Sequence, residues 1–201
     1  MNAKTQTPRQ KILGHAMRRF AQDGYANTAL ADVAADSEIT RSAVLYHFES
    51  KERLRQQVLG DVIDRWKSRL PKLMMTTESG EGRFEAIAWE VVHFFTEDVN
   101  RARLVVREML DRPAEMREAL FSELGEFMEL VTAALKLGQE SGVIRADIEP
   151  ASAVMQATHL LVGGLASFDV LGVFSGDDDE AFERYVTELV RFARAALFVN
   201  P

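Results

Sequence analysis

The feature that most constrains the fold is a pair of short helical patterns joined by a tight turn, within residues 24–54. The first pattern repeats apolar residues at positions i, i+3 and i+4: Leu30, Val33 and Ala34. The second places Val44 and Phe48 one turn apart, where both pack inward, and Ser37-Glu38-Ile39 between the two patterns fits a turn. The arrangement predicts a helix-turn-helix, in which the N-terminal part of the second helix enters the DNA major groove.

Two threonines are expected to begin these helices. Thr28 precedes the first helix and Thr40 the second, and a threonine hydroxyl can accept a hydrogen bond from a free N–H of the first turn. The outer face of the second helix, available for DNA, then consists of Arg41, Ser42, Ala43 and Tyr46. Arg41 reads guanine O6 and N7 with its guanidinium, and the alternatives are a phosphate contact or a solvated side chain.

The stretch resembles the DNA-binding domain of the tetracycline-repressor (TetR) family of bacterial transcriptional regulators. The residues that carry the resemblance are Gly24-Tyr25, Thr28, Val33-Ala34, Ile39-Thr40, His47-Phe48 and Ser50-Lys51-Glu52. The sequence departs from the family pattern at Glu38, where a turn glycine is usual, at Ser42, and at Leu45, where tyrosine is usual. Because glutamate lacks glycine's ease with positive φ, we expect a strained turn at Glu38.

Four residues are predicted to contact DNA phosphates: Thr28, Tyr46, His47 and Lys51. Lys51 opens the next helix, where its ammonium and the helix N-terminus both favour an anion. His47 has the alternative of capping local backbone.

The charge distribution agrees with a DNA-binding N-terminal segment. Residues 1–55 hold nine Lys and Arg against six Asp and Glu, a net charge of +3, and the rest holds 15 against 25, a net charge of −10. A basic segment on an acidic body can meet phosphates while the body repels DNA elsewhere. We therefore expect two domains, a DNA-binding domain over 1–55 and an effector-binding and dimerisation domain over 56–201.

The apolar periodicity predicts an all-α chain of nine helices, which is the plan that the resemblance implies. Besides the two short helices, the expected spans are Pro8 to Gly24, Ser50 to Met75 with a bend at Pro71, 83–97, 101–110, 113–142, 150–172, and a last helix after the acidic turn 175–179 that ends near Val199. A loop is expected over 76–82.

An effector pocket is predicted between the helices of the larger domain. Trp89, His93 and Thr96 share one helix face, and polar groups within an aromatic lining suit a largely apolar small molecule. The full set of predicted effector-binding residues is Trp66, Trp89, His93, Phe94, Arg107, Glu108, Phe127, His159 and Phe168. The alternative for each is plain core or surface.

The last two helices carry more apolar surface than one partner can cover, which favours a homodimer interface. The predicted interface residues are Leu160, Gly164, Leu165, Phe168, Phe182, Tyr185, Leu189 and Phe192. The resemblance implies a two-fold four-helix bundle built from these helices. Their burial within one chain is the alternative.

The rival interpretation is a helical-bundle enzyme, possibly metal-dependent. Glu90 and His93 have the Glu-x-x-His spacing of di-iron bundles, but the nearest second copy has Gln156 in place of the glutamate. The chain has no cysteine, and it lacks an N-terminal apolar signal core and an uninterrupted apolar run of about 18 residues. We expect a cytoplasmic protein without catalytic residues, metal, cofactor or membrane contact.

The sequence as a whole predicts a ligand-responsive transcriptional regulator, most simply a repressor. As a homodimer it would bind a palindromic double-stranded operator, because a two-fold site needs two reading heads. A small-molecule effector would release it from the operator.

Overall fold

The computed structural model describes residues 7–74, 80–174, 176 and 178–199. Its helices are α1 Pro8–Gln22, α2 Gly24–Asn27, α3 Leu30–Asp36, α4 Arg41–Phe48, α5 Lys51–Lys67, α6 Leu70–Met74, α7 Gly80–Thr96, α8 Asn100–Asp111, α9 Pro113–Glu140, α10 Pro150–Leu171, the 3-10 turn η1 Gly172–Phe174, and α11 Asp179–Leu197. An isolated antiparallel bridge joins Ile144 to Phe198. The all-α prediction is confirmed.

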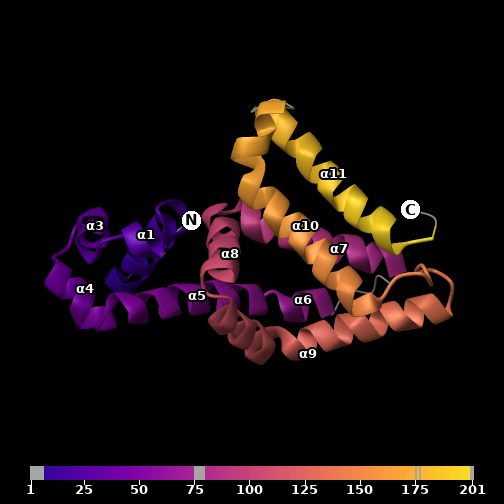
Figure 1. The fold of residues 1–201 in the computed structure, drawn as a ribbon, viewed down its shortest axis with the longest axis horizontal. Helices are drawn as coiled ribbons and strands as arrows, with labels where there is room; N and C mark the ends of the chain where they lie inside the picture. The colour runs from indigo at the N-terminus through magenta and orange to yellow at the C-terminus, as the bar shows by residue number, and fades with distance from the viewer. Residues whose placement is uncertain (1–6, 75–79, 175, 177, 200–201) are drawn as a thin grey trace.

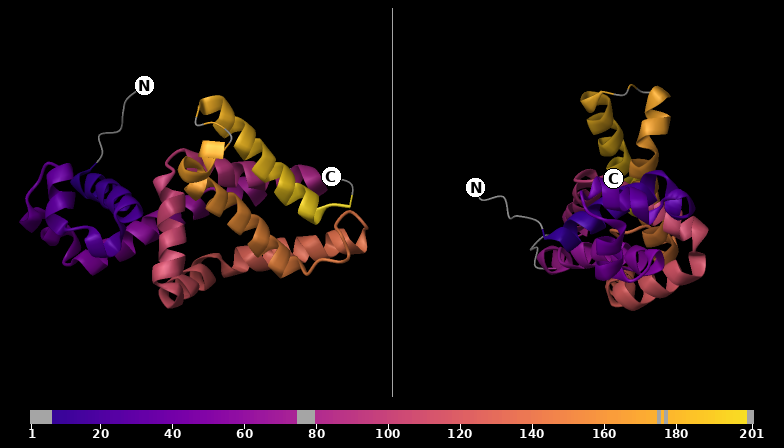
Figure 2. Two further views of the ribbon diagram at one scale, coloured as in Figure 1. Left: turned by 45° about the horizontal axis from the view of Figure 1, so that its top comes forward. Right: turned by 90° about the vertical axis from the view of Figure 1, so that its left-hand side faces the viewer.

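The helices form a small head and a larger body joined by α5 (Figure 1). The head contains α1 to α4, and α5 continues from beneath it into the body, followed by α6. In the body, α8 stands at the junction, α9 and α7 run lengthwise, and α10 crosses between them. Helices α10 and α11 form a hairpin that projects from the body, as the right-hand view of Figure 2 shows.

The count of nine helices is wrong in two places. A four-residue helix, α2, precedes the helix-turn-helix, and the fourth predicted helix is divided into α5 and α6 at Ser68 and Arg69. The break lies just before Pro71, which lacks an N–H and clashes with the preceding turn of a helix. Helix α7 also begins at Gly80 rather than 83. The expected helix end at Met75 and most of the expected loop lie outside the described residues.

The cap of α4 is confirmed, but that of α3 is not. The Thr40 hydroxyl accepts from the Ala43 N–H at 3.1 Å. The Thr28 hydroxyl instead donates to the Gly24 carbonyl at 2.9 Å, because Thr28 closes the short helix α2. The N-cap of α3 is Ala29, whose own N–H donates to the Asp32 carboxylate at 3.2 Å.

The turn of the helix-turn-helix contains the expected strain. Glu38 has φ +58°, a left-handed conformation that costs a residue with a side chain more than it costs glycine. A second positive φ, +63° at Glu49, follows α4, where the Ser50 N–H donates back to the Phe48 carbonyl at 2.6 Å. Both ends of α4 are therefore fixed by tight turns.

Two arginines hold the head against the body. Arg55, on α5, is 1% exposed and forms ion pairs with Glu108 of α8, Glu115 of α9 and Glu52 of its own helix. Arg107, on α8, donates to the carbonyls of Ala21 at 2.7 Å and Gln22 at 3.0 Å, at the end of α1. The orientation of α1 and α5 is thus fixed by groups on α8 and α9.

Helix α10 is unusually apolar for the burial that it receives. The segment Pro150–Phe174 is long and apolar enough to cross a membrane by length and composition alone, a test that core helices of soluble proteins also pass. Only 28% of its most apolar window is buried within the protomer. Most of this apolar window of α10 is therefore not covered by the rest of the chain.

We predict that Arg55→Met lowers the free energy of unfolding by about 3–5 kcal/mol, because removal of one partner leaves Glu108 buried without its counter-charge. Arg53→Met removes an exposed arginine from the same helix and should change stability by less than about 0.5 kcal/mol. Urea denaturation followed by circular dichroism measures both. Equal losses for the two variants would contradict a structural role for the buried pair.

Candidate nucleic-acid interface and ligand-binding region

The outer face of α4 is held rigidly and turned to solvent. Val44 and Phe48 are 0% and 1% exposed and fix the helix on the head. On the opposite side Arg41 and Ser42 are exposed, and Tyr46 is 86% exposed. An exposed polar face on a short helix with a buried inner face is the geometry of a recognition helix.

The head that presents α4 is braced by an ion pair. Arg19 of α1 forms a two-point contact with the Asp36 carboxylate of α3, at 2.7 and 2.9 Å. The hydrogen bond from Arg19 holds the pKa of Asp36 below its usual value. Since a planar guanidinium fits a carboxylate in one orientation, this contact fixes α3 relative to α1.

The predicted phosphate contacts differ in how available they are. The Lys51 ammonium lies 4.3 Å from the centre of the Tyr25 ring and 3.4 Å from the Ala26 carbonyl, at the start of a helix capped by Ser50. His47 is half-buried with its ring edge-on to Tyr46, at 5.5 Å. Thr28 is 2% exposed and its hydroxyl is engaged with α2.

Part of the predicted effector set forms a close-packed aromatic cluster in the body. Trp66 and Phe94 meet edge to face, with ring centres 5.4 Å apart, and Phe94 is 1% exposed. The Arg69 and Arg101 guanidiniums lie 5.1 and 4.6 Å from the centre of the Phe94 ring. Hydrogen bonds from these two arginines lower the pKa of the neighbouring Glu97.

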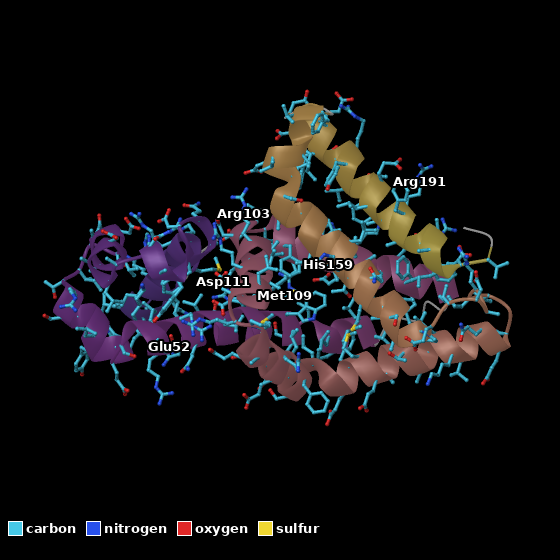
Figure 3. All side chains as sticks on the ribbon, viewed as in Figure 1. Glu52, Arg103, Met109, Asp111, His159 and Arg191 are labelled. Carbon is cyan, nitrogen blue, oxygen red and sulfur yellow. The ribbon has the colours of Figure 1, made fainter. Side chains whose placement is uncertain are left out.

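The other predicted effector residues are dispersed. Trp89 is half-buried and His93 exposed, with ring centres 6.1 Å apart. Phe127 is half-buried on α9, and His159 is exposed on α10 (Figure 3). Phe168 of α10 packs against aromatic rings of α11. Helical spacing correctly indicated which residues share a face, but it did not indicate which faces meet.

Two members of the set, Arg107 and Glu108, lie instead at the joint between head and body. Arg107 binds the end of α1, and burial raises the pKa of Glu108 while the adjacent Arg55 acts in the opposite direction. Arg55 itself was not singled out from the sequence. Its signal is its position, one turn before Val58 and Leu59 on the buried stripe of α5.

Several residues predicted at the dimer interface pack within the protomer. A Cβ at Gly164 would lie 2.8 Å from Leu189 Cδ1, and the Tyr185 hydroxyl donates to the Gly164 carbonyl at 3.3 Å. Leu165, Phe168 and Leu189 are buried in the same seam. This seam joins α10 to α11 of one chain, which agrees with the alternative of burial within the chain for these residues.

Other residues of the predicted interface are open to solvent. Leu160 and Phe192 are 37% and 63% exposed. Further exposed apolar residues of the same hairpin are Met155, Val170, Leu171, Val173 and Phe174. A Cβ at Gly163 would meet only His159 Nε2, at 3.8 Å. Gly163 therefore lies on the open face of α10, whereas Gly164 lies on the closed one.

The comparisons with known proteins agree with this geometry. Residues 12–58 match the family model described as "Bacterial regulatory proteins, tetR family". The chain is 25% identical to the transcriptional repressor KstR2 of Rhodococcus jostii over 142 residues, 70% of each protein. The chain contains a TetR-family domain over residues 12–58.

Other relatives support the TetR assignment over shorter stretches or by fold. The regulator AcrR of Shigella flexneri is 36% identical over 55 residues, which is 27% of this chain and 26% of AcrR. The structure of KstR2 from Mycobacterium tuberculosis superposes with a TM-score of 0.77 at 15% identity, covering 97% of both chains. A regulator from Saccharomonospora viridis, solved with choline, gives a TM-score of 0.66 at 18% identity, over 94% of this chain and 97% of that one.

The enzyme interpretation loses its support. The relatives are named transcriptional regulators. The Glu90 carboxylate of the Glu-x-x-His pair accepts from Arg69 at 2.6 Å, and His93 is exposed. Within the described ranges, no group of three or more His, Cys, Asp and Glu is arranged to hold a metal ion.

We predict that Arg41→Ala weakens binding to the operator by about 1–3 kcal/mol and relaxes base preference at one position in each half-site. Selection of binding sites from random DNA, with wild type and variant, measures both effects. Arg117→Ala removes the same charge from an exposed position on α9 and controls for net charge. An unchanged selected motif with Arg41→Ala would show that Arg41 reads no base.

Proposed function

We propose that this TetR-family regulator is a ligand-responsive repressor that binds a palindromic operator as a homodimer and is released by a small-molecule effector. The observation that carries the proposal is the rigid exposed face of α4, with Arg41, Ser42 and Tyr46 outward over buried Val44 and Phe48. One such face reads one half-site, and a two-fold pair of heads reads a palindrome. The working compartment is the cytoplasm, where the operator is.

The dimer is proposed on the open faces of α10 and α11. These faces carry exposed Leu160, Val170 and Phe192, with Gly163 among them. A second copy would cover the same apolar residues by symmetry, because a two-fold interface joins identical patches. This cover accounts for the high hydropathy of α10 without a membrane.

The effector is proposed to act through the joint between head and body. A ligand shifts a two-state equilibrium only if it binds the two states with different affinity. Because Arg55 and Arg107 tie α5 and α1 to α8 and α9, a ligand that displaces α8 moves the head with it. The distance between two heads on one operator changes, and operator affinity falls.

The proposed effector is a largely apolar small molecule that binds near Trp89, with a polar end toward His93. The half-buried indole offers apolar contact, and the exposed imidazole one turn away offers a hydrogen bond. Two proteins of the same fold support an effector of small-molecule size. One is described as a ketosteroid transcriptional regulator, and the other was solved with choline.

We predict that Gly163→Glu yields a folded monomer that no longer binds the operator. Within one chain the new side chain would meet only the exposed His159, whereas in the proposed dimer its carboxylate would be buried in an apolar contact. Sedimentation measures the oligomeric state, and circular dichroism confirms the helical content. Thr158→Glu, at an exposed position on another face of α10, should remain dimeric.

The neighbouring Gly164 differs from Gly163 in that its Cβ position is occupied within one chain. Gly164→Glu forces a side chain against Leu189 and should unfold the α10–α11 seam. A Gly163→Glu variant that sediments as a dimer and binds the operator normally would exclude the open face of α10 as the dimer interface.

We predict that Trp89→Ala leaves operator affinity nearly unchanged and abolishes release by apolar compounds that release the wild type. Fluorescence anisotropy of labelled operator measures release, and thermal melts measure stability. Phe121→Ala, at an 80% exposed aromatic residue of α9, is the control. A stability loss of about 3–5 kcal/mol with a normal effector response would show that Trp89 is core.

A further inference from the structure

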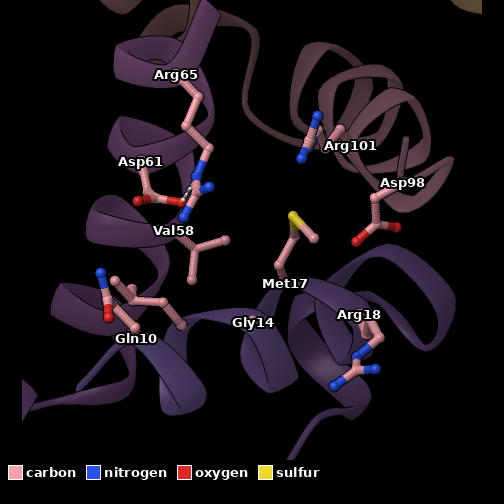
Figure 4. Close-up of a pocket in the computed structure, with 10 residues that line it drawn as sticks. Gln10, Gly14, Met17, Arg18, Val58, Asp61, Arg65, Asp98 and Arg101 are labelled. Carbon is pink, nitrogen blue, oxygen red and sulfur yellow. Dashed lines mark hydrogen bonds and ion pairs between the residues drawn. The ribbon is translucent and has the colours of Figure 1, made fainter. Parts of the chain in front are cut away.

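A cavity that none of the predicted effector residues lines lies between the head and the body. Its volume is about 590 Å³, within the range of roughly 300–1,000 Å³ found for small-molecule sites. Its walls come from three helices and the turn before α8 (Figure 4), and the lining residues are Gln10, Leu13, Gly14, Met17, Arg18, Val58, Asp61, Arg65, Asp98 and Arg101.

The floor of the cavity is apolar and is kept open by a glycine. Leu13 and Val58 are buried and Met17 is half-buried. Gly14 lies in the middle of α1, where glycine costs about 1 kcal/mol relative to alanine. A Cβ there would meet nothing within 4 Å, so packing does not require a glycine at this position. Its effect is to leave space above the floor.

The two facing walls each carry one arginine and one aspartate. Asp61 and Arg65 belong to α5, and Asp98 and Arg101 belong to the turn and first residues of α8. Figure 4 shows Arg65 and Arg101 on opposite sides, with the Met17 side chain between them. Groups of both signs therefore surround the apolar floor.

The hydrogen bonds of these groups leave capacity for a ligand. Arg65 uses Nε for Asp61 at 2.6 Å, and Arg101 uses one terminal nitrogen for the Phe94 carbonyl and Glu97, whereas a guanidinium has five N–H donors. Asp98 accepts from Asn100 through Oδ1, at 3.1 and 2.9 Å. Among the residues that the structure describes, Arg101 pairs with Glu97 and no ion pair involves Asp98. The Asp98 carboxylate can therefore attract an ammonium group.

We propose that this cavity binds a small zwitterion with an apolar side chain, of the amino-acid class. The carboxylate of the ligand binds Arg65 and Arg101, and its ammonium group binds Asp98. The apolar side chain of the ligand occupies the space above Gly14. Since the walls belong to both head and body, an occupant ties α1 to α5 and α8. This site is separate from the proposed effector region around Trp89, and its existence does not depend on the proposed repressor function.

The test is calorimetric titration of the full chain with L-phenylalanine. We expect saturable binding, and binding at least about tenfold weaker for 3-phenylpropionate, which lacks the ammonium, and for phenethylamine, which lacks the carboxylate. Gly14→Leu fills the cavity and should abolish binding. Gly125→Leu introduces the same side chain at another helical glycine with nothing within 4 Å of its Cβ, and should bind normally.

Asp98→Asn tests the chemistry separately from the space. Asparagine retains an oxygen for Asn100 but removes the charge, so the preference for L-phenylalanine over 3-phenylpropionate should disappear. Melts by circular dichroism establish that each variant is folded. Absence of saturable binding by the wild type, normal binding by folded Gly14→Leu, or equal affinity for the three probes would each overturn the proposal.

Discussion

The arrangement of head and body depends on one buried guanidinium. Arg55 is almost fully withdrawn from water, which is costly for a charge unless carboxylates and hydrogen bonds compensate it. Glu52 of its own helix compensates part of the charge, but Glu108 and Glu115 lie on α8 and α9, so full compensation requires these helices in their present positions against α5. An apolar side chain would tolerate sliding, whereas the planar guanidinium accepts few geometries. The joint is therefore directional as well as stable.

The hairpin of α10 and α11 separates two uses of apolar surface. One face closes within the chain, where Gly164 allows Leu189 to approach its backbone. The other leaves Val170, Phe174 and Phe192 exposed. Consecutive glycines, Gly163 and Gly164, thus point to different surroundings because successive helical residues are about 100° apart. A chain of this size can then hold its own hairpin together and still expose apolar residues on the other face.

Much of the head could be predicted from sequence because its signals are local. The spacing of Val44 and Phe48 and the cap at Thr40 involve residues within one or two turns, and all three are as expected. Predictions that required knowing which distant faces meet were less successful. Periodicity marked Leu165 as apolar-facing but did not distinguish its own α11 from that of a second chain. The burial of Arg55 could not be predicted from the sequence, because a charged side chain is expected to be exposed unless its ion-pair partners are known. Those partners lie on α8 and α9, far away in the sequence.

The Arg107 contact makes the joint unequally sensitive to substitution. Its two acceptors are main-chain carbonyls of residues 21 and 22, which almost any amino acid supplies equally well. Substitution of the exposed Gln22 side chain would therefore leave the contact intact, while loss of the single guanidinium on α8 removes both hydrogen bonds. Gly24 is the exception on the head side, because its φ of +81° disfavours a side chain and a Cβ would lie 3.3 Å from that guanidinium. Among related sequences, tolerance should be broad at the exposed residue 22 and narrow at Gly24, at Arg107 and at Ala21, whose side chain is buried.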